Sequence, residues 1–135
     1  MLTDTRFFKT PIVLIHGGGY DVSSYLAPKP NVWVDISSMA FVCPTPECAA
    51  TLRVHLTLAP GKLLFGTDAG AGPTMPQSDV QRLLLSRATR EALYLALSTL
   101  VRDGVITERL ALDMGRGVLR DNARRLYGWS KSGSP

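Results

Sequence analysis

The chain has 135 residues, of which 45% are hydrophobic and 19% charged, with a formal net charge of +4. This length fits one domain, and this composition argues against disorder. No apolar stretch approaches the roughly 20 residues that span a bilayer, and the first residues make a poor signal peptide. Cys43 and Cys48 could pair, but so few cysteines without an export signal are usually reduced. We therefore expect a cytoplasmic protein with no membrane partner.

The positive excess lies mostly in the last third of the chain. Acidic residues are interspersed among the basic ones there, and no stacking aromatics are interleaved with them. This pattern favours a solvated helix face over a nucleic-acid surface. We expect no nucleic-acid partner.

Three short apolar runs predict buried strands over residues 12–15, 32–36 and 63–65. The first run ends at His16 and three glycines, and the third is followed by Gly66-Thr67-Asp68. Between the second and third runs, a helix is predicted over residues 47–58, with prolines near its start and just past its end.

Beyond Asp68 the chain changes character. Residues 69–76 form a glycine- and proline-rich loop, which suits a loop over a site. Ser78 or Asp79 can cap a long helix that runs to about Arg102, and Thr107 can cap a final helix that ends at Tyr127. The predicted apolar stripe of the long helix consists of Val80, Leu83, Leu84, Ala88, Ala92, Leu95 and Leu100. We expect one domain, residues 1–128, and a flexible tail, residues 129–135.

Strands that alternate with helices predict an α/β fold with a parallel sheet and right-handed crossovers. The carboxyl ends of parallel strands meet at one edge of the sheet, so His16 and Asp68 are expected to converge there. Three strands leave two unpaired edges. An oligomer or a complementing chain would cover them.

Four segments in order, VLIHGGG, NVWVDIS, LRVHLTLAPGKLLFGTDAG and NARRLYG, resemble the C-terminal part of the amidohydrolase superfamily. The similarity runs from about Pro11 to Gly128 and is closest to the amidohydrolase-related, metal-dependent TIM-barrel enzymes. It implies a partial TIM barrel, with three strands equivalent to strands 6–8 and with intervening and C-terminal helices. By this resemblance, His16 binds the metal or exchanges protons near it, Asp68 is a metal-proximal carboxylate and general base, and Asn122 is structural.

The resemblance also implies a function. Such enzymes hydrolyse amide- or ester-like C–N or C–O bonds of small molecules, or carry out related decarboxylations, with a metal-activated water. The expected cofactor is a divalent ion, zinc first, with manganese or iron as alternatives.

The family site also contains a His-x-His pair and further ligands from middle strands. This sequence has only two histidines, His16 and His55, and no His-x-His. A catalytic zinc takes about three protein ligands. The sequence is therefore interpreted as a fragment that lacks part of the active site.

Other interpretations remain open. The chain could be a non-catalytic remnant, or a subunit that needs a partner chain. As a distant third, the HGGG and GTDAG segments resemble esterase motifs, but an esterase triad needs a later histidine, and none follows residue 55.

Of the remaining residues, Asp35 is expected to be a hydrogen-bonded structural acid and His55 a partly exposed surface residue. Trp33 and the late leucines are expected in the core.

Overall fold

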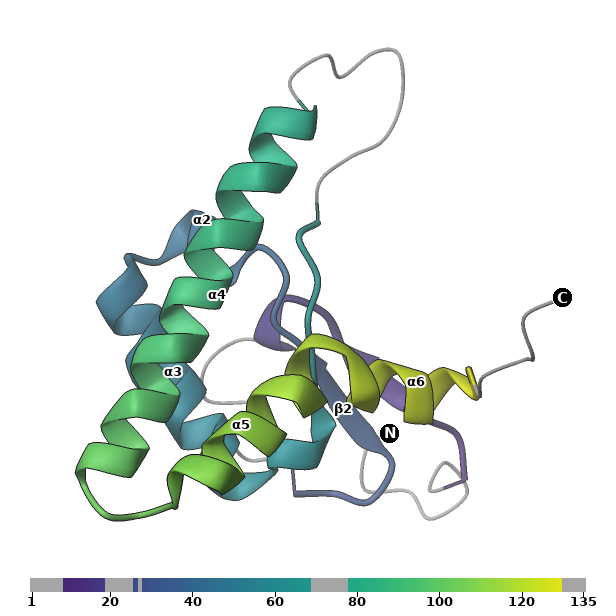
Figure 1. Ribbon diagram of the computed structural model, residues 1–135. Coiled ribbons are helices and arrows are strands. Elements are labelled where there is room, and N and C mark those ends of the chain that lie inside the picture. Colours follow the sequence, from purple (N-terminus) through teal and green to yellow (C-terminus); the bar gives the residue numbers. More distant parts are fainter. Residues whose placement is uncertain (1–8, 19–25, 27, 69–77, 130–135) are drawn as a thin grey trace, which may run out of the picture.

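The computed structural model describes residues 9–18, 26, 28–68 and 78–129 (Figure 1). The predicted loop over residues 69–76 lies outside the described residues, as does the predicted tail apart from Trp129. None of the described helices is long and apolar enough to cross a membrane.

A parallel sheet lies at the centre of the fold. Its strands follow the order β1-β2-β3, with Leu14 opposite Val34 and Asp35 opposite Leu64. The bounds are β1 Ile12–Leu14, β2 Val32–Asp35 and β3 Leu63–Leu64. All three predicted strands and their parallel arrangement are confirmed, although each ends one residue earlier than predicted. The first strand stops early because the chain turns over Ile15–Gly18, where His16 and Gly17 have positive φ.

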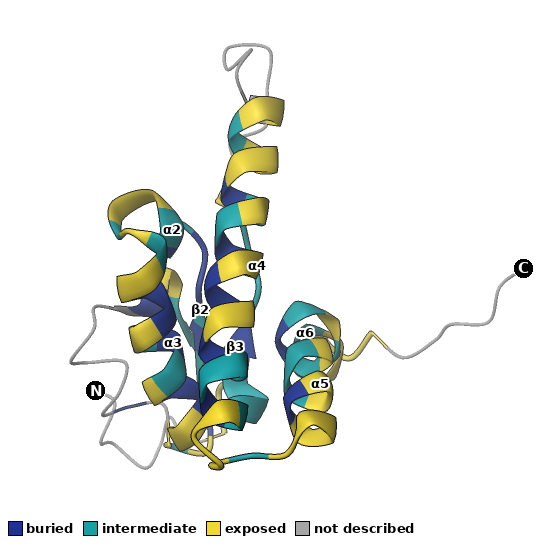
Figure 2. Cartoon of the chain, turned by 60° about the vertical axis from the view of Figure 1, so that its left-hand side comes forward, coloured by how far each residue is buried: buried dark blue, intermediate teal, exposed yellow. Residues whose placement is uncertain are grey.

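Three helices pack beside the sheet. These are α2 (Met39–Val42), α3 (Thr45–Leu58) and α4 (Ser78–Arg102), and α3 and α4 lie side by side (Figures 1 and 2). Two of the predicted helices correspond to α3 and α4, and the third to the C-terminal helical run. The sequence analysis did not predict α2, which spans only four residues.

The C-terminal region is one helical run with a wider turn in its middle. It comprises α5 (Glu108–Arg116), a π-helical turn (Gly117–Asp121) and α6 (Asn122–Tyr127). The predicted cap is confirmed, since Thr107 Oγ1 accepts a hydrogen bond from the Leu110 N–H at 3.2 Å. The π turn places the Val118 carbonyl where the Phe65 N–H donates to it at 3.1 Å. The wide turn thereby ties the helix to the chain just after β3.

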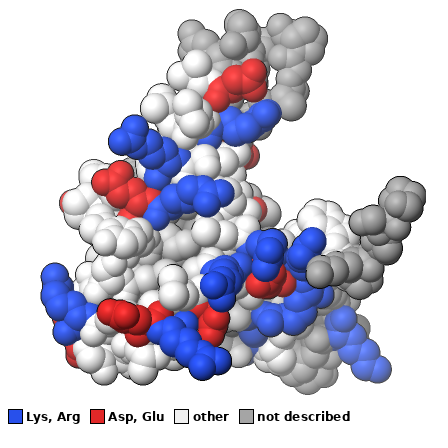
Figure 3. Space-filling model, viewed as in Figure 1, with Lys and Arg blue, Asp and Glu red and all other residues white. Residues whose placement is uncertain are grey.

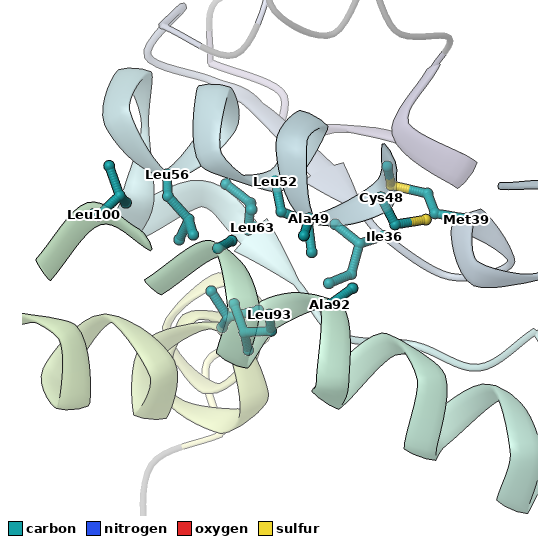
Figure 4. Packing of buried hydrophobic residues seen from close by; sticks show 12 residues of the cluster. Ile36, Met39, Cys48, Ala49, Leu52, Leu56, Leu63, Ala92, Leu93 and Leu100 are labelled. Carbon is teal, nitrogen blue, oxygen red and sulfur yellow. The ribbon is translucent and has the colours of Figure 1, made fainter. Parts of the chain in front are cut away.

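The main core lies between the sheet, α2, α3, α4 and the π turn. Figure 4 shows side chains from these helices, from Ile36 just after β2 and from Leu63 of β3 directed toward one another. The buried members are Ile36, Met39, Cys48, Ala49, Leu52, Leu56, Leu63, Ala92, Leu93, Ala96, Leu100 and Val118.

The predicted apolar stripe of α4 was wrong in its first half. Val80, Leu83 and Leu84 are 60–69% exposed, because the first turns of α4 project past the rest of the described fold (Figure 2). Leu95 is also exposed, whereas Ala92 and Leu100 are buried as predicted. The face of α4 that is actually buried carries Leu85, Thr89, Ala92, Leu93, Ala96 and Leu100.

Three further expectations need correction. His55 is fully buried, not on the surface, because it shares the core-facing side of α3 with Leu52 and Leu56. Trp33 is only half-buried, with the Arg125 guanidinium 5.4 Å from its ring centroid. Of the late leucines, Leu110 and Leu112 are exposed on α5.

Candidate functional site

Two predicted site residues meet at the carboxyl edge of the sheet. His16 follows β1 and Asp68 follows β3, and the imidazole Nε2 lies 3.7 Å from the carboxylate Oδ2. Both side chains are about half exposed, at 48% and 53%. The expected convergence is therefore seen in the structure. At this exposure, an ion pair between them would add little to stability.

Two serines that sequence reasoning missed join them. Ser37 and Ser38 lie two and three residues after β2, the strand between the other two. The Nδ1 atom of His16 lies 3.1 Å from both the carbonyl oxygen and Oγ of Ser37. The Ser38 hydroxyl donates a hydrogen bond to Asp68 Oδ2 at 2.7 Å. Their position after a parallel strand was the available signal, because it places them at the same edge as His16 and Asp68.

The backbone at this edge is bent in an unusual way. Within the described ranges, three residues other than glycine have positive φ, and all three belong to this cluster: His16 at 57°, Ser38 at 56° and Asp68 at 55°. Residues held in this region cost about 1–3 kcal/mol each, and they cluster at functional sites. This backbone geometry marks the edge as a candidate site.

Asp35 and Gly66 hold the serine turn in place. Asp35 Oδ1 accepts a hydrogen bond from the Ser37 N–H at 2.6 Å, so the expectation of a hydrogen-bonded structural acid is confirmed. A Cβ atom at Gly66 would lie 3.0 Å from Ser37 Cβ and 3.1 Å from Asp35 Oδ1. Only glycine lets the segment that follows β3 approach the serine turn this closely.

The two cysteines do not extend the site. Both are free, and burial raises the pKa of the Cys48 thiol to about 12. The Cys48 thiol also donates to the Cys43 carbonyl at 3.5 Å. Metals bind the thiolate form, which this environment disfavours. Among the residues the structure describes, no group of three or more His, Cys, Asp or Glu side chains could hold a metal ion.

The outer helices carry a mixed surface. Basic and acidic side chains stand next to one another over the face shown in Figure 3. On the C-terminal run, Arg116 pairs with Asp113 at 3.4 Å and Arg120 with Asp121 at 2.6 Å. An apolar groove of about 460 Å³ lies between α4 and α5, away from the His16–Asp68 edge, and includes Leu93 in its lining.

The structure thus defines an α/β protein with polar side chains gathered at the carboxyl edge of a parallel sheet. A family model described as amidohydrolase matches residues 5–129, and the chain belongs to the amidohydrolase family. This membership supports a hydrolase-type function on small molecules, in a family that generally uses divalent metals. It also favours this class over the esterase alternative. No curated protein and no solved structure matches the chain.

Proposed function

We propose that the chain carries part of a metal-dependent hydrolytic centre of the amidohydrolase type, with His16 and Asp68 as its site residues. The observation that carries the proposal is the 3.7 Å approach of Nε2 to Oδ2 at the carboxyl edge of a parallel sheet. Family membership supports it. In this proposal, β1, β2 and β3 correspond to the sixth, seventh and eighth strands of a TIM barrel.

The donor chemistry fits a divalent metal ion, but only in part. Imidazole nitrogen and carboxylate oxygen are ordinary ligands of zinc, manganese and iron. Two ligands of one tetrahedral zinc lie about 3.4 Å apart at usual bond lengths, close to the separation seen between His16 and Asp68. These two residues supply two of the roughly three protein ligands that a catalytic zinc takes.

The side chains suit hydrolysis. When bound, a divalent ion supplies a Lewis acid that makes water a nucleophile near neutral pH. The contacts from Ser38 and His16 both engage Asp68 Oδ2, so Oδ1 can accept a proton from the attacking water without breaking either contact. His16 acts through Nε2, either as a ligand or by returning a proton to the leaving group. The substrate is a small molecule with an amide- or ester-like bond, or an acid that undergoes related decarboxylation.

A second candidate is a non-catalytic remnant, or a subunit whose site is completed by another chain. The absence of a third donor among the described residues favours it. In the described sheet, β1 and β3 each pair only with β2. A second copy or a complementing chain could pair with these edges and bring the missing ligands.

Turnover by the purified chain tests the proposal. We would assay panels of small amides, esters and carboxylic acids with added Zn²⁺, Mn²⁺ or Fe²⁺, at several protein concentrations. The proposal predicts metal-dependent turnover that Asp68→Asn abolishes and the control Ser98→Ala, on α4, retains. Specific activity that rises with protein concentration would indicate a site shared between copies. No turnover under any condition would favour the non-catalytic alternative.

A further inference from the structure

We infer that Ser37 and Ser38 are positioning residues: their hydrogen bonds orient the imidazole of His16 and the carboxylate of Asp68 relative to each other. The role of this orientation in metal binding rests on the proposed function, whereas the orientation itself is argued from contacts among the described residues. Both serines follow β2, so one turn of backbone reaches His16 after β1 and Asp68 after β3.

The main chain of Ser37 selects the tautomer of His16. A carbonyl oxygen can only accept a hydrogen bond, so the 3.1 Å contact between Nδ1 and the Ser37 carbonyl is a hydrogen bond only when Nδ1 carries the proton, and we assign the proton there. The Ser37 hydroxyl, also 3.1 Å from Nδ1, can rotate to accept as well. Nε2 of the neutral ring then bears the lone pair. Ser37 is only 4% exposed and its N–H is held by Asp35, so this acceptor is fixed by the fold.

The side chain of Ser38 holds the carboxylate of Asp68. Its hydroxyl donates to Oδ2 at 2.7 Å, a short contact typical of a charged acceptor. Ser38 has a φ of 56°, a conformation that glycine adopts with less strain. A serine at this position introduces backbone strain, but its hydroxyl provides the hydrogen bond to Asp68.

Together the two contacts leave two electron-pair donors facing each other. With the proton of His16 on Nδ1, Nε2 and Asp68 Oδ2 stand 3.7 Å apart without a hydrogen between them. Such a pair is repulsive unless a proton or a metal ion lies between the atoms. The serine pair therefore prepares this edge to receive a cation, and outer partners of this kind typically change metal affinity 10- to 100-fold.

The Ser37 contact is tested by nitrogen NMR of the metal-free chain, labelled with ¹⁵N at histidine. The chain has only two histidines, and the buried His55 serves as the internal comparison. In spectra where both imidazoles are neutral, we expect His16 to carry its proton on Nδ1. Ser37→Ala should keep this tautomer, because the carbonyl remains. A neutral His16 with its proton on Nε2 in the unaltered chain would overturn the inference, whether or not the chain binds metal.

The Ser38 contact is tested with Ser38→Gly, which removes the hydroxyl and relieves the positive φ. We expect a fold at least as stable as the original, a loss of the single Asp68 χ1 rotamer in scalar couplings, and a 10- to 100-fold weaker affinity for Zn²⁺. The control Ser98→Ala should change none of these. An unchanged Asp68 rotamer in Ser38→Gly would overturn the inference. If the NMR results hold but the unaltered chain binds no Zn²⁺, the proposed function fails and the positioning role stands.

Discussion

His16 Nε2 lies 3.7 Å from Asp68 Oδ2, although the two residues follow different strands that do not pair with each other. Both strands flank β2 and run parallel to it, so their carboxyl ends point to the same edge. The turn that follows β2 fills the space between the two ends, with Ser37 against His16 and Ser38 against Asp68. The site is thus a product of strand order.

Gly66 is predicted to be essential for this edge. Gly66→Ala would place a methyl group 3.0 Å from Ser37 Cβ and is expected to destabilise the fold by about 1–3 kcal/mol. The control is Gly104→Ala. Gly104 has a φ of 69°, but no atom would lie within 4 Å of an added Cβ, so this substitution should lower the free energy of unfolding by only about 1 kcal/mol. Urea unfolding gives both values. Only Gly66→Ala should also shift the NMR signals of Ser37 and Asp35, and unperturbed signals would count against the close approach.

Asn122 is predicted to anchor the C-terminal helix to the sheet. It is 3% exposed, and its side-chain nitrogen donates to the carbonyls of Leu63 at 2.8 Å and Pro60 at 3.1 Å. Asn122→Ala leaves these acceptors unpaired and should lower the free energy of unfolding by about 2–3 kcal/mol. The exposed Thr57→Ala should change it by no more than about 0.5 kcal/mol. Equal effects of the two substitutions in urea unfolding would contradict the anchoring role.

His55 is predicted to make stability depend on pH. Burial lowers the pKa of its imidazole in the folded chain, because the charged form is disfavoured. Below about pH 6.5 the unfolded chain therefore binds more protons, and the free energy of unfolding falls as the pH drops toward the folded value. One such group gives a slope of at most about 1.4 kcal/mol per pH unit. Denaturant unfolding between about pH 5 and 7.5 should show a shallower slope for His55→Gln, and an identical slope would refute this origin.

Much of this fold could be predicted because its signals are local. Short apolar runs located the three strands, and Thr107 marks a helix start by its own chemistry. His16 and Asp68 could be placed together because parallel strands share an edge. Asn122 was placed as structural by the resemblance alone.

The predictions were wrong or incomplete where tertiary packing determines the burial and the contacts of a side chain. The exposed leucines of α4 follow a helical period, but the projecting end of that helix has nothing described beside it. The spacing of His55 from Leu52 and Leu56 along α3 is that of a core residue. It was nevertheless predicted at the surface because its side chain is polar. Ser37 and Ser38 were missed because a serine after a strand is common in turns, and only the contacts to His16 and Asp68 distinguish these two.

Calorimetric titration of the purified, metal-free chain with Zn²⁺ tests the central claim most directly, with the mass of the complex measured alongside. We predict saturable, stoichiometric binding that His16→Ala and Asp68→Asn each weaken at least about tenfold, while Ser98→Ala leaves it unchanged. One ion per two chains would mean that copies complete the site together. No binding, or binding that neither site substitution alters, would contradict the assignment of His16 and Asp68 to a metal centre.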